Sequence, residues 1–202
     1  MSAHRGGMTM GRRRPRRGAY AGAMSTIGLV PHTGWTWLVR VAGPRGAPRV
    51  ERRDRVVACE VLDGELYHQA AERPRDRERF VATRRAAAVI QAQDTLRDHL
   101  VGVRAAIVLG KQPALAPVDR IVAAHPMIHG AEGGLWRAIF AEACAAAGVA
   151  VTRAEAGELP PLLAKRHAAA AIAAFLDDGK RTCGAPWSRE LQDAALGAWS
   201  VL

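Results

Sequence analysis

The chain has 202 residues and a mass of 21.6 kDa, which allows one compact domain with a tail but excludes two large domains. Apolar residues make up 49% of it and charged residues 24%, so wholesale disorder and a disulfide-stapled miniprotein are also excluded. The net charge of +10 is concentrated near the amino end, because residues 1–50 hold nine arginines and no acid, whereas residues 51–202 hold 20 basic and 19 acidic groups.

Residues 1–24 are rich in arginine and glycine and show no apolar periodicity. Such a segment cannot offset its ordering entropy by burial, so we expect a disordered basic arm followed by a folded domain over residues 25–202. Two interpretations of the arm stay open. It could bind phosphates through counterion release, or it could be a misassigned start that precedes a true start at Met24.

The sequence contains no apolar segment that fits a secretory leader or a membrane span. Without an export signal, Cys59, Cys144 and Cys183 are expected to be reduced thiols, and their spacing matches no metal motif. We therefore expect a cytoplasmic protein with no membrane partner. The oligomeric state is left open.

Three strands are predicted first. Residues 27–30 and 35–41 are apolar and flank turn residues at 31–34, which indicates a hairpin. Residues 49–62 supply a third strand, separated from the second by the turn residues Gly43-Pro44-Arg45-Gly46. The sequence therefore predicts three consecutive antiparallel strands.

Helices and strands then alternate. Apolar residues spaced by three or four predict a helix over 76–100, and residues 103–109 form an apolar run typical of a buried strand. Residues 117–148 are predicted to be helical with a kink at Pro126, and 149–153 to be another short buried strand. An alanine-rich helix is expected over 159–180, and Ser188 is a plausible N-cap of a last helix. The predicted order is β-β-β-α-β-α-β-α-α.

Two strings lie at the ends of this pattern: GLVPHTGW at residues 28–35 and DAALGAW at residues 193–199. Together with the element order, they resemble the ribonuclease H-like fold, and in particular the RuvC-type Holliday-junction resolvases, over residues 26–202. In those enzymes a first strand of the form G-[IL]-D-P-G runs into a T-G hairpin, and a last helix carries a run like D-A-A-D-A-L. The strings HPMIHGAEG, YHQAAE and GAPWSRELQDAALGAW are also similar to a bacterial group.

The resemblance implies an α/β fold: a ribonuclease H-like mixed sheet, with three antiparallel strands then two parallel strands, flanked by helices. It also implies two metal ions held by clustered carboxylates. Val30 stands where the first-strand acid would be, and no carboxylate ends the strand before Gly110, so the usual nuclease mechanism is not expected. Only Asp193 matches the position of an acid in the family that the chain resembles. It is kept as a candidate catalytic residue, with a solvated helix residue as the alternative.

Histidines offer a replacement for the missing acids. His125, His129 and Glu132 follow spacings of four and three, which puts them on one helical face. Two imidazoles and a carboxylate at this spacing suit Zn²⁺ or another divalent transition metal. The three residues are candidate metal ligands, and His129 and Glu132 are also candidate catalytic residues. Histidine pairs on helices also serve as caps or hydrogen-bonded core residues, and that alternative stays open.

Two further histidines follow predicted strands. His32 follows the first strand and His68 the third, and in the resembled fold these regions approach the same end of the sheet. His68 is therefore a candidate metal ligand and His32 a candidate catalytic residue of one composite His/Glu pocket. A turn hydrogen bond is the alternative role of His32. The five tryptophans are most simply interpreted as core residues.

Two functional hypotheses follow. The first is a ribonuclease H-like, resolvase-like protein that binds or processes nucleic acid with a remodelled His/Glu site, as a metal-dependent phosphodiesterase or nuclease if it is an enzyme. The second is a noncatalytic scaffold or partner-binding module that kept the fold and lost the nuclease chemistry. Fold alone does not choose between them. No phosphate loop, dinucleotide fingerprint or nucleophilic serine motif is present.

Overall fold

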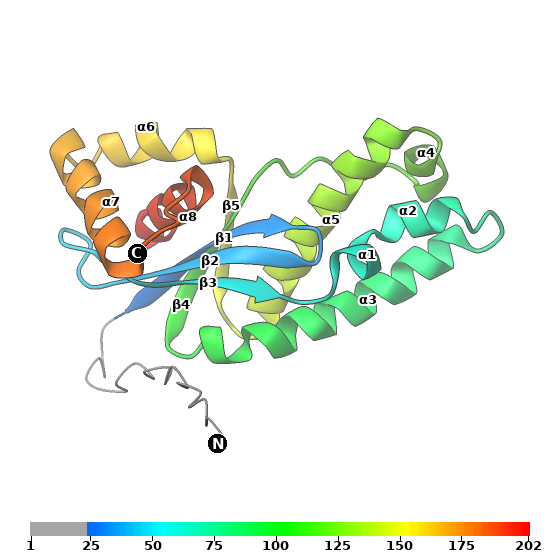
Figure 1. The fold of residues 1–202 in the computed structure, drawn as a ribbon, viewed down its shortest axis with the longest axis horizontal. Coiled ribbons are helices and arrows are strands. Elements are labelled where there is room, and N and C mark those ends of the chain that lie inside the picture. The colour runs from blue at the N-terminus through cyan, green and yellow to red at the C-terminus, as the bar shows by residue number, and fades with distance from the viewer. Residues whose placement is uncertain (1–23) are drawn as a thin grey trace, which may run out of the picture.

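One mixed sheet of five strands forms the centre of the computed structural model, which describes residues 24–202 (Figure 1). The strands are β1 (Ser25–His32), β2 (Trp35–Ala42), β3 (Arg49–Val57), β4 (Val103–Leu109) and β5 (Ala150–Ala154). They lie in the order β3-β2-β1-β4-β5. β1 pairs antiparallel with β2 and parallel with β4, β2 and β3 are antiparallel, and β4 and β5 are parallel. The predicted fold class, three antiparallel strands followed by two parallel ones, is confirmed.

Helices cover both faces of this sheet. The α-helices are α1 (Val61–Gly64), α2 (Leu66–Ala71), α3 (Arg77–Leu96), α4 (Val118–Val122), α5 (His125–Ala146), α6 (Leu159–Ala164), α7 (Ala169–Cys183) and α8 (Arg189–Ser200). Two short 3₁₀ turns lie at Arg97–His99 and Ala156–Glu158. Figure 1 shows α2, α4 and the first turns of α5 extending past one end of the sheet.

The alternation of side chains along β1 separates two hydrophobic layers. Ile27 and Leu29 point into a layer with α3 and α5, where Trp136 and Phe140 are fully buried. Val30 joins the other layer, which contains the apolar faces of α7 and α8. Residues at even positions of β1 therefore face α8, and this assignment decides where His32 lies.

Helix α8 packs directly on the backbone of β1. A Cβ atom placed on Gly28 would lie 1.9 Å from the carbonyl oxygen of Ala194 on α8, so only glycine permits this approach. The Thr26 hydroxyl donates a 2.6 Å hydrogen bond to the carbonyl of Ala198 one turn later. Helix α8, which carries Asp193, is thus fixed against the first strand.

Several predicted elements are shorter than expected, for identifiable reasons. β3 ends at Val57 because the amides of Ala58 and Cys59 turn to the carbonyl of Gly34, and two short helices follow. The predicted 117–148 helix is broken at Ala124, whose backbone is extended, and Pro126 occupies the first turn of α5, where its missing N–H is not needed.

Two predictions in the carboxyl half also need correction. The predicted helix over 159–180 is two helices, because a turn follows Ala164 in which the amides of Arg166 and His167 both donate to Leu163. β5 is the outer strand of the sheet, so it is not buried on both sides, and Thr152 and Arg153 are exposed. The predicted arm at residues 1–24 lies outside the described residues except for Met24. No helix within residues 24–202 has the length and apolar character needed to cross a membrane.

Candidate metal centre

Three histidines converge beyond the end of the sheet. His68 on α2 lies beside His125 and His129 in the first turns of α5, and one ligand nitrogen from each ring falls within 4.8 Å of the others. The rings meet edge to face, with centroids 4.4–5.3 Å apart. The Nε2 atoms of His125 and His129 are 2.9 Å apart. We call His68, His125 and His129 the histidine cluster.

Local sequence explains why α2 and α5 bring these rings together. Ile128 and Ala131 anchor the first turns of α5 in the core, which leaves His125 and His129, one turn apart, on the exposed side. On α2 the buried residues Leu66, Tyr67 and Ala70 hold the helix against this layer, and His68 lies at the edge of that buried face. The helices that carry the histidine cluster are therefore anchored in the core, while His125 and His129 are exposed to solvent.

Glu132 lies behind His68. Its side chain is 3% exposed overall, and its Oε1 accepts hydrogen bonds from the amides of Tyr67 and His68 and from Nδ1 of His68, the last at 3.0 Å. Because a carboxylate only accepts, this contact places a proton on Nδ1 of His68, so Nε2 is the nitrogen of this ring that could bind a metal ion. A carboxylate that fixes the tautomer and direction of a histidine in this way is typical of metal sites.

The cluster can be tested for fit to a metal ion. A tetrahedral Zn²⁺ with bonds of about 2.0–2.1 Å places its ligand nitrogens roughly 3.3 Å apart. The His125 and His129 nitrogens, at 2.9 Å, are slightly too close, and the group as a whole, within 4.8 Å, needs to contract by an ångström or so. Small rotations of two exposed rings achieve this. Imidazole nitrogens favour zinc and other transition metals over Mg²⁺, so the residues present fit such an ion.

The other two candidate catalytic residues lie against α8. The Nε2 atom of His32 is 3.3 Å from a carboxylate oxygen of Glu190, and its ring is stacked on Trp35. Asp193 accepts a 3.0 Å hydrogen bond from Nε of Arg189, and burial raises the pKa of its carboxyl, an effect that Arg189 opposes. The structure thus brings together four of the six candidate residues, His68, His125, His129 and Glu132, and pairs His32 and Asp193 with α8 neighbours.

One cation near the end of β4 was missed by the sequence analysis. The Arg137 side chain on α5 lies over Gly110 and Gly133, where a Cβ atom would approach it to 2.9 and 3.2 Å. Its Nε is buried and has no hydrogen-bond partner among residues 24–202, and burial lowers its pKa. An arginine without an acid partner is a candidate anion ligand. Two glycines in the sequence could have indicated this arginine: Gly133, four residues before it, and Gly110, which follows β4.

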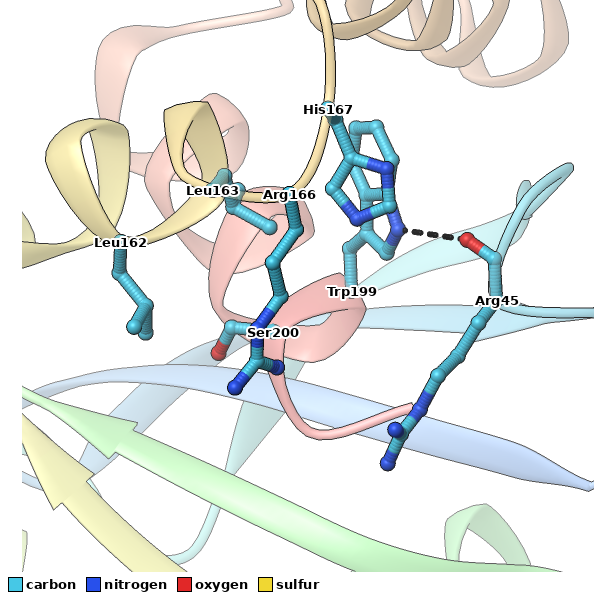
Figure 2. A pocket seen from close by; sticks show the side chains of 7 residues that line it. All are labelled: Arg45, Leu162, Leu163, Arg166, His167, Trp199 and Ser200. Atoms are coloured by element: carbon cyan, nitrogen blue, oxygen red, sulfur yellow. Dashed lines mark hydrogen bonds between the residues drawn. The ribbon is translucent and has the colours of Figure 1, made fainter.

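A separate small pocket lies between α6 and the end of α8 (Figure 2). Its volume is about 130 Å³, and the His167 ring lies over Trp199, whose indole N–H donates to the Arg45 carbonyl. Figure 2 shows the side chains of Arg45 and Arg166 at its rim. None of the six candidate residues lines this pocket, so it is distinct from the histidine cluster.

Comparison with known proteins gives a similarity of structure only. No protein-family model matches the chain, and no curated protein matches it. Among solved structures it is similar to Thermus thermophilus RuvC, with 19% identity, a TM-score of 0.49, and coverage of 88% of this chain and 92% of that one. It is also similar to T. thermophilus RuvC in complex with a Holliday junction substrate, at 16% identity and the same TM-score, covering 88% and 91%.

The chain has an α/β fold built on one mixed sheet flanked by helices. Its first three strands are antiparallel and β5 is parallel to β4, which agrees with the predicted three antiparallel and two parallel strands. At these identities the similarity assigns no substrate or reaction to the chain. A reaction has to be argued from the side chains themselves.

Proposed function

We propose that this protein binds nucleic acid and hydrolyses phosphodiester bonds at a single divalent transition-metal centre held by His68, His125 and His129. The observation that carries the proposal is the convergence of three imidazoles in front of a buried carboxylate, Glu132, that fixes one of them. Three histidines leave a fourth position of a tetrahedral ion open, as in catalytic rather than structural zinc sites. When bound, the metal would supply a water molecule of lowered pKa.

The reaction balances without a further reactant. Water adds to phosphorus, the bond from phosphorus to one ester oxygen breaks, and that oxygen takes a proton, which yields a phosphomonoester and a hydroxyl group. The protein's own part is to position the ring of His68 through Glu132 and to bind the anionic backbone. Catalytic roles for His32 and Asp193 stay predictions.

Charge near the cluster supports an anionic substrate. Arg137 is on the same helix as His129 and, at eight residues further along, lies about 12 Å away along the helix axis. It faces no acid among the described residues, so a phosphate would offset the cost of its partial burial. We expect Arg137→Gln to weaken nucleic-acid binding and to lower the slope of log affinity against log salt by about 0.7–0.9.

Metal binding gives the first test. We expect purified protein, stripped of metal, to take up one Zn²⁺ or Co²⁺, and the Co²⁺ form to show the visible absorption of a tetrahedral site. His129→Ala and His68→Ala should weaken binding by more than the roughly 10–100-fold expected for loss of an outer hydrogen bond. His167→Ala, in the separate pocket, is the matched control and should bind metal normally.

Hydrolysis gives the second test. Cleavage of a fluorescent single-stranded oligonucleotide should depend on the metal and be lost in His129→Ala and His68→Ala but not in His167→Ala. If the wild type binds no metal at the cluster, the proposed centre is wrong. If it binds metal but cleaves no phosphodiester, the hydrolytic function is wrong, and a noncatalytic role of the same fold replaces it.

A further inference from the structure

Three planar side chains stack beside the hairpin that joins β1 and β2. The imidazole of His32 is nearly parallel to the indole of Trp35, at a centroid distance of 4.0 Å and an angle of 6°. The guanidinium carbon of Arg55 lies 4.3 Å from the centroid of the Trp35 ring. We call His32, Trp35 and Arg55 the stacked ladder. Packing of this kind on tryptophan is favourable both through dispersion and through the charge on the guanidinium.

The register of the sheet sets the order of the ladder. His32 on β1 is the cross-strand partner of Trp35, and Arg55 on β3 is the partner of Trp37, two residues further along β2. Because β2 lies between β1 and β3, the imidazole and the guanidinium approach Trp35 from opposite sides. Trp37 meets Trp35 edge-on at 5.5 Å. The indole of Trp35 is thus enclosed, and the ladder ends in an imidazole on one side.

The His32 end of the ladder is open. Its side chain keeps 32% of its surface exposed, although Glu190 lies 3.3 Å from Nε2 and that nitrogen is buried. Trp35 covers one face of the ring. We infer that the exposed part is the other face with the adjoining ring carbons, a flat aromatic surface with the indole of Trp35 behind it.

Two arginines lie at the ladder and beside its acid. Arg55 is exposed and covers the ring of Trp35. Arg189 begins α8 next to Glu190 and pairs with Asp193. The combination of a flat aromatic face with a cationic border suits a planar base carried on an anionic backbone.

We propose that the stacked ladder is a binding site for an unpaired nucleobase of single-stranded nucleic acid, with the base on the outer face of His32 and the adjoining phosphates near Arg55. This inference rests on the proposed nucleic-acid substrate and specifies its form. In a duplex the faces of the bases are covered by their neighbours, so a site that reads a base face selects unpaired segments.

An abasic comparison isolates the stacking. Binding of the full-length, metal-free protein is measured to a single strand of about 12 thymidines and to an abasic strand of equal length. Both strands carry the same phosphates, so the contribution of arginines elsewhere in the chain cancels in the ratio. We expect the wild type to prefer the base-containing strand by about 5- to 150-fold, the value of one stacked base.

Variants assign the preference to the ladder. Trp35→Leu and His32→Leu should reduce the ratio to near one, whereas Arg55→Gln should weaken binding to both strands and lower the salt slope by about 0.7. Phe80→Leu is the matched control. Phe80 lies on α3, and the guanidinium carbon of Arg73 lies 4.3 Å from the centroid of its ring, the same distance as between Arg55 and Trp35. That variant should keep the wild-type ratio. Circular dichroism of each variant reports whether the sheet is intact, and Arg55→Gln tests the site without removing an aromatic ring.

The outcomes separate this inference from the hydrolytic proposal. A wild-type ratio near one, or a ratio that survives in Trp35→Leu and His32→Leu, overturns the stacking site even if the metal centre cleaves. A ladder-dependent ratio in a protein that binds no metal upholds the stacking site and overturns the hydrolytic centre. Absence of binding to either strand by the metal-free protein overturns the stacking site, and cleavage by the metal-bound protein tests the hydrolytic centre separately.

Discussion

At the scale of single residues, Glu132 shows how a carboxylate that was predicted to be a metal ligand can instead hold a neighbouring histidine in place. The spacing of His125, His129 and Glu132 predicts three ligands on one helical face. In the structure the third imidazole comes from His68, and Oε1 of Glu132 is already occupied by two amides and by Nδ1 of that ring. Its role in the proposed centre is therefore to position His68.

Glu132→Gln tests this positioning role. The amide oxygen can still accept from His68 but carries no charge, so the imidazole is less basic and less firmly held. We expect metal affinity to fall about 10- to 100-fold, less than for removal of His68 itself. Competition against a chromophoric chelator measures the affinity. Glu142→Gln, an exposed acid on the same helix that pairs with Arg85, is the control and should bind as the wild type does. Equal affinities of both variants would refute the role.

The histidine spacing could be predicted from the sequence, but the contribution of His68 could only be placed near the same end of the sheet. The four-residue step from His125 to His129 fixes their shared face wherever a helix forms. By contrast, the contact of His68 with Glu132 depends on α2, a helix of only six residues that follows β3 and the short helix α1. Helices this short leave little periodicity to detect.

Asp193 carries a prediction about pH. Burial raises the pKa of its carboxyl above the ordinary 3.8, so the folded state holds this proton more tightly than the unfolded state does. The resulting stability is fully present below pH 3.8 and is lost as the pH rises through the raised pKa. We expect the free energy of unfolding of Asp193→Asn, relative to wild type, to increase over that window. Urea unfolding from acidic to neutral pH measures it. A relative stability that falls with pH would mean that the Arg189 pair dominates.

At the scale of elements, strand alternation separates His32 from the histidine cluster. His32 and Val30 have the same parity as Gly28, whose face is covered by α8, whereas Ile27 and Leu29 face α3 and α5. Placing His32 at the correct end of the sheet was possible from the sequence. The face of the sheet on which His32 lies could not be predicted, because it depends on which helices cover which face. That arrangement is set by packing between residues far apart in the chain.

The same contact of β1 with α8 supports a stability prediction. A Cβ at position 28 would overlap the backbone of Ala194, which cannot move without displacing α8, so Gly28→Ala should destabilise the fold by about 1–3 kcal/mol or more. Gly130→Ala is the matched substitution, since no atom lies within 4 Å of its added Cβ. Because Gly130 lies inside α5, in its second turn, the substitution should stabilise the fold by about 0.5–1 kcal/mol. Denaturant unfolding measures both, and equal effects would contradict the packing of α8.

At the scale of the whole molecule, the positions of the five strands along the chain were predictable because each strand carries a clear local signal. The run at 103–109 coincides with β4, whose last four residues are buried on both faces of the sheet. β5 was placed correctly, but its burial was overestimated because an outer strand and an inner strand can share the same short apolar pattern. The separation of α6 from α7 was also missed, since alanine favours helix throughout residues 159–180 and does not mark the turn.

Metal binding should couple to the stability of the whole fold. An ion held by His68 and by His125 and His129 links α2 to α5, and α5 contains the fully buried Trp136 and Phe140 of the core. Because such a site forms only in the folded state, Zn²⁺ at about a hundred times its dissociation constant should raise the free energy of unfolding by about 2.7 kcal/mol. Mg²⁺ at the same concentration should have little effect, since it prefers oxygen ligands. Thermal unfolding of wild type, His129→Ala and His167→Ala measures this coupling. Stabilisation of His129→Ala equal to that of His167→Ala would place the bound ion elsewhere on the protein.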